Sequence, residues 1–163
     1  MNRLTEMAAA LGARLQASGT TVAVAESSAG GLVSAALLAV PGASAYYKGG
    51  GVIYTRDARA GLLHLPPEVV TMQGATEEYA LIVARAIREA LRADWGLAET
   101  GASGPAGNRY GHAAGHCCVA VAGPVERSVT LETGSDDREE NMWAFAARAL
   151  ALLDESLDKG RTV

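Results

Sequence analysis

Length, composition and charge place this chain among single-domain globular proteins. Its 163 residues are 49% hydrophobic and 20% charged, which suffices for one buried core. The formal net charge of −4 argues against nucleic-acid binding, because such domains usually present a clustered basic surface. No apolar run is long enough to span a bilayer, and Glu6 interrupts the apolar core that a signal peptide would need. We therefore expect a cytoplasmic protein without membrane or nucleic-acid partners.

The N-terminal part alternates between helix and strand patterns. Leucines spaced along one face predict an amphipathic helix from Leu4 to about Ser18. Residues 21–26 are an apolar strand, residues 27–31 a Ser/Gly turn, and residues 32–38 a helix. A strand, a glycine turn and a helix start form an anion site, because free N–H groups point outward with the positive end of the helix dipole. We predict that residues 27–31 bind an anion in this way.

The middle of the chain contains a second strand and three helical patterns. After Pro41-Gly42 breaks the chain, residues 51–55 are expected to form a short strand that delivers Tyr54. Residues 57–63 then look helical, and another short helical segment starts at Pro66. Thr76 is expected to cap a long helix with a buried apolar stripe. The stripe consists of Tyr79, Ile82, Val83, Ala86, Ile87, Ala90 and Leu91.

The last third begins with another strand, which is followed by a second glycine-rich loop. Residues 95–100 form the strand and residues 101–107 the loop, and ligand crevices lie at such places. We predict that this loop and residues 27–31 lie at the same edge of the sheet and form one anion pocket. Residues 116–122 and 125–132 should pair as an antiparallel hairpin. A final helix should follow, capped by Ser135 or Asp136, with a frayed polar tail over 154–163.

The cysteines and histidines do not predict a metal site. Cys117 and Cys118 are adjacent on a strand, so their side chains point to opposite faces and a mutual disulfide would strain the backbone. We expect both to be reduced. His112, His116 and this cysteine pair lack the paired C-x-x-C spacing of a structural zinc site. The sequence therefore predicts no metal.

Several motifs resemble those of the CinA C-terminal domain family, which includes the PncC-type nicotinamide mononucleotide amidases. Residues 25–31 (AESSAGG) resemble A-E-S-C-T-G-G, and residues 41–47 (PGASAYY) resemble P-G-S-S-A-Y/W-F. Residues 50–59 (GGVIYTRDAR) resemble G-G-x-x-x-Y-S-N-x-A-K, and residues 100–105 (TGASGP) resemble T-G-I-A-G-P. Weaker matches lie at residues 73–78 and 134–139, so the resemblance covers about residues 4–157.

The resemblance implies a fold and a function. The expected fold is a single three-layer α/β/α domain over residues 1–163, with a mixed, mostly parallel sheet and a polar tail at 158–163. The family's amidases hydrolyse a carboxamide without a metal or organic cofactor, and members are commonly homo-oligomers. We therefore expect a homo-oligomer that acts on a small-molecule nucleotide.

Site residues follow from the resemblance by position. Ser44 matches the proposed serine nucleophile, Ser27 a ligand or helper serine, and Tyr54 and Arg59 the pair that assists proton transfer. By pattern alone, Ser44 would be a turn or helix-cap serine, Ser27 an N-cap and Tyr54 a half-buried strand tyrosine. The expected substrate-binding residues are Ser28, Gly30, Gly31, Thr100, Gly101, Ser103, Gly104 and Arg138.

The sequence also departs from the family pattern. The family lysine is Arg59 here, and a guanidinium does not release its proton near neutral pH, although it can hold an oxyanion or a phosphate. Lys48 is a candidate substitute base if residues 44–48 are helical, because it would then share a face with Ser44. Ala29 replaces a threonine, and residues 112–117 (HAAGHC) replace the K-P-x-G-T-x stretch, where Arg109 or His112 could supply the missing cation.

Two functional hypotheses therefore stay open. The first is an amidohydrolase that converts nicotinamide mononucleotide to the nicotinate nucleotide and ammonia with a serine nucleophile. The second is a CinA-like protein that binds the nucleotide but has lost turnover, which the change from lysine to Arg59 favours.

Overall fold

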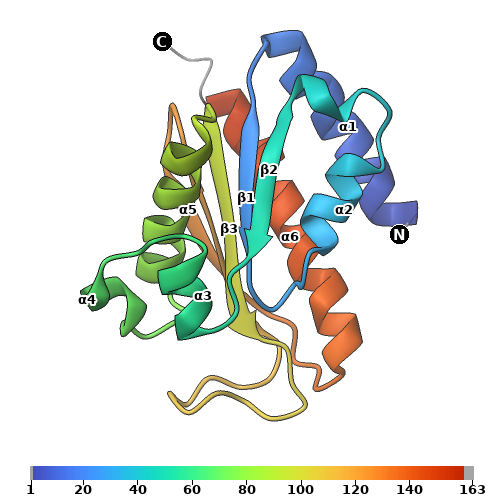
Figure 1. Cartoon of the computed structure of the whole chain (residues 1–163). Helices are drawn as coiled ribbons and strands as arrows, with labels where there is room; N and C mark the ends of the chain where they lie inside the picture. Colours follow the sequence, from blue (N-terminus) through green and yellow to red (C-terminus); the bar gives the residue numbers. More distant parts are fainter. Residues whose placement is uncertain (1, 160–163) are drawn as a thin grey trace.

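The computed structural model describes residues 2–159 and contains a five-stranded sheet covered by helices (Figure 1). The helices are α1 (Asn2–Ser18), α2 (Leu32–Leu38), α3 (Arg56–Gly61), α4 (Pro67–Val70), α5 (Glu77–Leu91) and α6 (Arg138–Lys159), with a short 3-10 helix at Ala43–Ala45. The strands are β1 (Val22–Glu26), β2 (Tyr47–Val52), β3 (Trp95–Ala102), β4 (His116–Ala122) and β5 (Arg127–Glu132). No helix within residues 2–159 is long and apolar enough to cross a membrane.

The sheet is mixed, with the strand order β2-β1-β3-β4-β5. β1 pairs in parallel with β2 and with β3, whereas β3 with β4 and β4 with β5 are antiparallel. The expected mixed sheet is confirmed, with two parallel and two antiparallel pairings in place of the expected parallel majority, and β4 is the one strand that opposes the others. Because β1, β2 and β3 point the same way, the loops that follow them meet at a single edge of the sheet.

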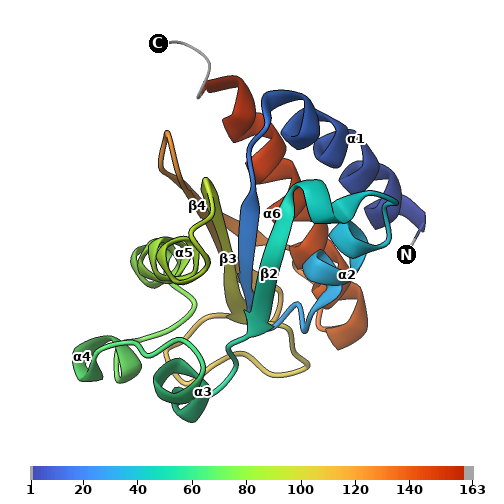
Figure 2. The ribbon, with the colours of Figure 1, turned by 45° about the horizontal axis from the view of Figure 1, so that its top comes forward.

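Helices cover both faces of the sheet, as Figure 2 shows. α1, α2 and α6 pack together on one face, with a core that includes Leu11, Leu37 and Phe145. α5 covers the other face, where its Tyr79 and Val83 are buried. The three-layer α/β/α architecture is thus confirmed, and the inner strands β1, β3 and β4 contribute side chains to both cores.

Several element boundaries differ from the predicted ones. The second strand is β2 (Tyr47–Val52) and not residues 51–55, so Tyr54 lies in the loop after the strand. Its glycines allow pairing close to β1, where a Cβ at Gly50 would lie 2.4 Å from the Val24 carbonyl oxygen. α6 starts at Arg138 and its first turn is capped by Asp137, whose side chain accepts from the Glu140 N–H at 2.9 Å.

The predicted frayed tail over 154–163 is partly wrong. Residues 154–159 belong to α6, because Leu157 packs into the core and the Arg14 guanidinium on α1 binds Asp154 and Asp158. The rest of that expectation, at residues 160–163, lies outside the described residues.

Candidate functional site

A cavity of about 370 Å³ opens at the edge where the three parallel strands end. Residues from four separate segments form its walls, because the loops after β1, β2 and β3 converge there and the segment before α5 joins them. The lining residues are Ser27, Tyr54, Arg56, Arg59, Met72, Gly74, Ala75, Thr100, Gly101, Asn108, Arg109 and Tyr110. Three of the twelve are arginines, so the cavity is strongly cationic.

A second, smaller cavity of about 200 Å³ adjoins the first. Tyr54, Gly101 and Asn108 line both cavities, and the smaller one is completed by Ser28, the 102–107 loop and Arg138. The prediction that residues 27–31 and 101–107 lie at the same edge is therefore confirmed. Gly101 permits this contact, because a Cβ there would lie 3.1 Å from Ser28 Oγ and 2.5 Å from the His116 carbonyl oxygen.

Two buried carboxylates already occupy three of the five N–H groups that were predicted to bind an anion at residues 27–31, so these three are not open to a ligand. Glu99 accepts hydrogen bonds from the Ser27 and Ala29 N–H groups at 2.9 and 2.8 Å. Glu26 accepts from the Gly31 N–H at 3.2 Å and from two further N–H groups in the first turn of α2. The N–H groups of Gly31, Val33 and Ser34 at the start of α2 are thus satisfied by Glu26 within the protein.

Ser27 is not a helix cap either. The residue at the N-cap position of α2 is Gly31, which has a φ of 98° and no capping side chain, and Glu26 performs the capping role. Ser27 instead lies four residues earlier, where its backbone N–H is bound to Glu99 and the residue lines the larger cavity.

Burial controls the ionisation of Glu99. Removal from water raises the pKa of this carboxyl, while hydrogen bonds from Ser28, Ala29 and Ser27 act in the opposite direction. The Cys117 thiol lies 3.9 Å from Glu99, and burial together with this carboxylate raises the pKa of the thiol well above its usual value. Cys117 and Cys118 are both free and buried, and they face opposite cores, as expected.

The guanidinium of Arg59 is held in place by contacts within the chain. Its Nη1 donates to the carbonyl oxygens of Val70 and Met72 at 3.0 and 2.7 Å, and its guanidinium carbon lies 4.2 Å from the centre of the Tyr79 ring. Gly74 leaves room for the group, because a Cβ there would lie 2.8 Å from Arg59 Nη2. Arg59 thus lines the cavity as a fixed cation that anchors the segment before α5.

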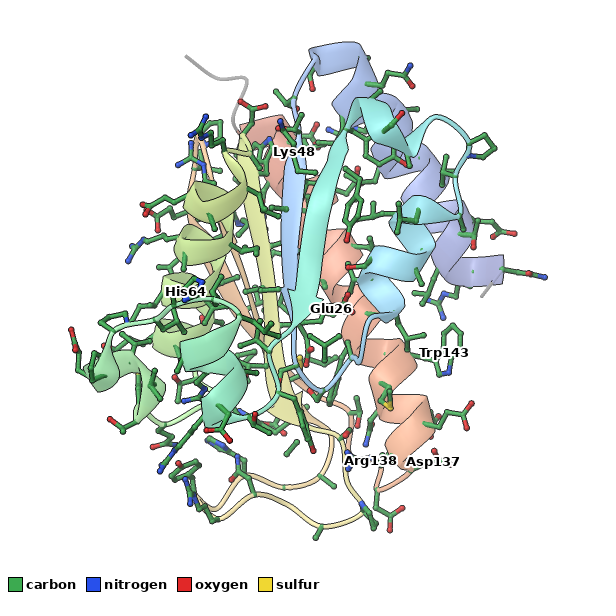
Figure 3. The ribbon with its side chains drawn as sticks, viewed as in Figure 1. Glu26, Lys48, His64, Asp137, Arg138 and Trp143 are labelled. Carbon is green, nitrogen blue, oxygen red and sulfur yellow. The ribbon has the colours of Figure 1, made fainter. Side chains whose placement is uncertain are left out.

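Tyr54 and Arg138 meet across the smaller cavity. Arg138 Nη2 donates to the Tyr54 hydroxyl at 3.3 Å, and Arg138 Nη1 donates to the Gly104 carbonyl oxygen at 2.5 Å. Figure 3 shows Arg138 at the start of α6, below the sheet edge and close to the loops that follow the parallel strands. Tyr54 is 59% exposed and not a half-buried strand residue, so its hydroxyl is accessible from the cavities.

The loop 108–112 forms the outer wall of the larger cavity. Asn108 Oδ1 accepts from the N–H groups of Tyr110 and His112 at 3.0 and 3.1 Å, which closes the loop into a tight turn. Arg109 Nη2 donates to the Tyr110 hydroxyl at 2.8 Å. The bond from Arg109 lowers the pKa of this phenol, and Arg56 lowers it further. Arg109, one of the two residues suggested as a replacement cation, thus lines the larger cavity, and its role there stays a prediction.

Ser44 and Lys48 lie away from both cavities within one chain. Ser44 is in the 3-10 helix that precedes β2, and Lys48 is the second residue of that strand, so the helical pairing expected for them is wrong. Figure 3 shows Lys48 at the end of the sheet opposite to Arg138. The six residues of β2 separate Ser44 from Tyr54, which at about 3.3 Å per residue is roughly 20 Å.

Most of the other predicted binding residues make contacts within the protein that stabilise its loops. The Thr100 hydroxyl accepts from the Ala75 N–H at 3.0 Å, and the Ser103 carbonyl accepts from Asn141 at 2.9 Å. Gly30 and Gly31 adopt φ values of 64° and 98°, which the turn before α2 requires. Of the predicted set, Ser27, Ser28, Tyr54, Arg59, Thr100, Gly101, Ser103, Gly104 and Arg138 line one cavity or the other.

Two features of the site are not visible in the sequence motifs. Glu99 supports residues 27–29 from a strand about 70 positions away, and a lone acidic residue in an apolar strand was its only signal. His116 lies beneath the site with its Nε2 2.8 Å from the Ala75 carbonyl oxygen. Within residues 2–159, no group of three or more His, Cys, Asp and Glu side chains is arranged to hold a metal.

Comparison with known proteins identifies the family. The family model described as "CinA C-terminal domain" matches residues 4–157. A CinA-like protein of Gloeobacter violaceus is 42% identical over 131 residues, covering 79% of this chain and 31% of that protein. A putative competence-damage inducible protein of Moorella thermoacetica is 36% identical over 147 residues, covering 90% of this chain and 36% of that protein. The chain thus spans about a third of the length of these relatives.

Solved structures show the same fold. The crystal structure of the competence/damage inducible protein CihA from Agrobacterium tumefaciens superposes with a TM-score of 0.86 at 30% identity, covering 95% of each chain. A CinA superfamily protein from Klebsiella pneumoniae has a TM-score of 0.89 at 25% identity, covering 96% of this chain and 98% of that one.

Fold and site together define an open α/β domain with a cationic cleft at the carboxyl ends of its parallel strands. The family match extends over nearly the whole of this domain. The chain belongs to the CinA C-terminal domain family.

Proposed function

We propose that this domain binds a small anionic nucleotide of the nicotinamide mononucleotide type in the cavity at the carboxyl ends of β1, β2 and β3. The single observation that supports this most is the arginine lining of the larger cavity, by Arg56, Arg59 and Arg109. Arginine is well suited to phosphate, because its planar donors match two oxygens at once. A cavity of about 370 Å³ is also of the size that small ligands occupy.

The two adjoining cavities suit a ligand with two parts. Tyr54 lies between them and lines both, as do Gly101 and Asn108. A nucleotide has a base, a sugar and a phosphate, so it can extend past Tyr54 with its anionic end near the arginines. The aromatic rings of Tyr54 and Tyr110 offer surfaces against which a flat base could pack.

A titration with nicotinamide mononucleotide by calorimetry tests the binding. We expect saturable binding in the parent, and a loss of about tenfold to a hundredfold in Arg56→Gln and Arg109→Gln, because a hydrogen bond to a charged group contributes about 1.5–3 kcal/mol. Arg85→Gln is the matched control, since Arg85 is exposed on α5 and pairs with Glu126. Equal affinity in all three variants, or no binding by the parent, contradicts the proposal.

A second function, carboxamide hydrolysis, is favoured by Ser27 and Tyr54, which both line the larger cavity. In this scheme a serine hydroxyl attacks the carboxamide carbon, ammonia leaves, and water then releases the nicotinate nucleotide. Of the two serines at motif positions, Ser27 and Ser44, it is Ser27 that lines the larger cavity within one chain. The Arg59 guanidinium cannot act as the base, since it stays protonated.

Ammonia release distinguishes the two functions and the two serines. If hydrolysis occurs in a single chain, Ser27→Ala abolishes it and Ser44→Ala does not. The opposite pattern makes Ser44 the nucleophile, which would then have to reach the cavity of another copy. The expected homo-oligomer stays a prediction, and light scattering of the purified protein measures it directly.

Arg59→Lys tests whether one substitution has suppressed turnover. A lysine at this position could exchange a proton, and general acid–base catalysis contributes about 10²–10⁴-fold. We expect ammonia release to rise by about tenfold or more, with nucleotide affinity changed only a few-fold. Lys48→Ala is the companion control, because Lys48 lies at the opposite sheet edge. A parent that is already active and not improved by Arg59→Lys counts against this explanation.

A further inference from the structure

Two histidines are stacked beneath the outer wall of the larger cavity. The rings of His112 and His116 lie 3.8 Å apart between centroids and are parallel to within 6°. His116 is buried at the start of β4, whereas His112 is half-buried in the loop 108–112. The stack therefore connects the rigid sheet to a loop that lines the cavity.

His116 holds the opposite wall as well. Its Nε2 lies 2.8 Å from the carbonyl oxygen of Ala75, which lines the cavity and has a left-handed φ of 54°. The same Ala75 donates its N–H to the Thr100 hydroxyl at 3.0 Å. A non-glycine residue in this conformation needs such support, because its backbone is strained. His116 thus contacts both walls of the cavity, one through Ala75 and the other through His112.

The partners of the two rings indicate their protonation states. Both ring nitrogens of His116 face oxygen atoms, since Nδ1 pairs with Glu132 and Nε2 with the Ala75 carbonyl. A doubly protonated ring satisfies both oxygens, because each nitrogen then donates. Asn108 Nδ2 lies 2.9 Å from His112 Nδ1. Asn108 Oδ1 is already used by two N–H groups, so its amide nitrogen must donate and His112 Nδ1 must accept.

We propose that His112 and His116 are positioning residues that hold the two cavity walls together in a pH-dependent way, with His116 doubly protonated and His112 neutral in the closed arrangement. When His112 is protonated, its ring N–H faces the side-chain N–H of Asn108, and the two donors repel. The rings of His112 and His116 are then two stacked cations. The bond from Asn108 is then lost and the loop 108–112 moves away from the cavity.

Other charged groups around the stack do not replace this role. Glu132 on β5 faces His116, and its side chain is 58% exposed. Glu77 on α5 is engaged by Ser128 and Thr130, and these bonds lower its pKa, so it stays ionised. The Cys118 thiol lies 3.7 Å from His116 Nε2. Arg109 is directed to the Tyr110 hydroxyl, and Asp136 shares a shallow hollow with Ala113 and Ala114 beside His112.

Amide NMR of the intact protein tests the proposal without any ligand. The probes are the Asn108 side-chain amide and the backbone N–H groups of Tyr110 and His112, which bond to the Asn108 side chain. From about pH 8 to about pH 5, where histidine ordinarily titrates, we expect these signals to move together with the His112 ring. In His112→Gln they should stay at their high-pH positions, because the glutamine oxygen accepts from Asn108 and does not titrate.

The controls separate positioning from a general effect of acid. His64→Asn removes the remaining histidine of the chain. His64 is exposed in the segment between α3 and α4, and Figure 3 shows it away from Arg138. This variant should behave as the parent does. His116→Gln should shift the signals of both Ala75 and Asn108. Loop signals that do not move with pH in the parent, or that still move in His112→Gln, overturn the proposal. Unchanged Ala75 and Asn108 signals in His116→Gln overturn it as well.

A binding experiment adds a functional measure, and it rests on the proposed function. We expect the parent to bind nicotinamide mononucleotide about threefold to tenfold more weakly near pH 5.5 than near pH 7.5, as the loss of a hydrogen bond implies. The ligand phosphate itself titrates near pH 6. The pH dependence of nucleotide binding by His112→Gln measures the contribution of the phosphate. The additional pH dependence of binding by the parent measures the contribution of the histidines. An equal dependence in both proteins counts against the proposal. If neither protein binds, the proposed function fails, and the NMR result still decides the role of the histidines.

Discussion

Glu26, the last residue of β1, lies next to Glu99 within the parallel strand β3, and together they bind the backbone of residues 27–34. Between them they accept hydrogen bonds from five N–H groups, of Ser27, Ala29, Gly31, Val33 and Ser34. Burial is the main cause of the raised pKa of Glu99, and the charge of Glu26 adds to it. The glycine turn therefore owes its shape to acidic side chains inside the protein.

The two carboxylates should respond differently to replacement by glutamine. Both oxygens of Glu26 accept from N–H groups, so Glu26→Gln turns an amide N–H₂ toward N–H donors. We expect the free energy of unfolding to fall by about 1–3 kcal/mol, the cost of unsatisfied buried groups. Urea unfolding of parent and variant measures this. A change below about 0.5 kcal/mol, as at an ordinary surface site, contradicts the capping role.

Glu99→Gln should be tolerated and should change the pH dependence of stability. One Glu99 oxygen accepts from the Ser27 and Ala29 N–H groups, and the other faces the Ser28 hydroxyl, which can reverse its direction. In the unfolded chain the carboxyl titrates near 4.5, and in the folded protein its pKa is higher. Between these values the folded state binds more protons, so the free energy of unfolding of the parent falls as pH rises through this range.

The measurement is urea unfolding of parent and Glu99→Gln from about pH 4 to about pH 8. The stability of the parent relative to the variant should decrease as pH rises above 4.5 and become constant once Glu99 is ionised. A relative stability that is flat, or that increases with pH, would mean that burial does not disfavour the carboxylate.

Arg59→Met should weaken the wall formed by the segment before α5. The substitution leaves the Val70 and Met72 carbonyl oxygens without the Arg59 donor and removes the cation above Tyr79. We expect a loss of about 1–3 kcal/mol in the free energy of unfolding. Arg56→Met, on the exposed face of the same helix, is the matched control and should change stability by less than about 0.5 kcal/mol. Equal effects of the two variants would mean that the contacts of Arg59 contribute nothing.

Both cysteines should resist alkylation in the folded protein. Burial raises the pKa of Cys118 and, together with Glu99, raises that of Cys117 well above the usual value, so little thiolate forms. Iodoacetamide at about pH 8 should add no label in native buffer and two labels in urea, as mass spectrometry can show. Rapid labelling of the native protein at Cys117 would require β4 to open far more readily than its position between β3 and β5 suggests.

Local pattern and chain order allowed much of the architecture to be predicted. Thr76 caps α5 by accepting from the Tyr79 N–H at 3.1 Å, as its position before an apolar stripe indicated. The loops after β1 and β3 share one edge, because parallel strands end on the same side of a sheet. Family membership follows from motifs of contiguous residues, which a sequence displays directly. These features depend on neighbours within a few positions, where side-chain period and turn chemistry are sufficient.

Tertiary structure decided which groups in the site are free and which are occupied. The N–H groups of residues 27–31 look available in the sequence, yet Glu99 fills two of them from the neighbouring strand. Lys48 belongs to a strand and not to a helix with Ser44, because β2 pairs with β1 as far back as Tyr47. His116 reaches Ala75 only because β4 and the segment before α5 pack together. The contacts of Glu99 with Ser27 and of His116 with Ala75 join residues 72 and 41 positions apart. Their distances depend on strand order and register, which no local pattern specifies.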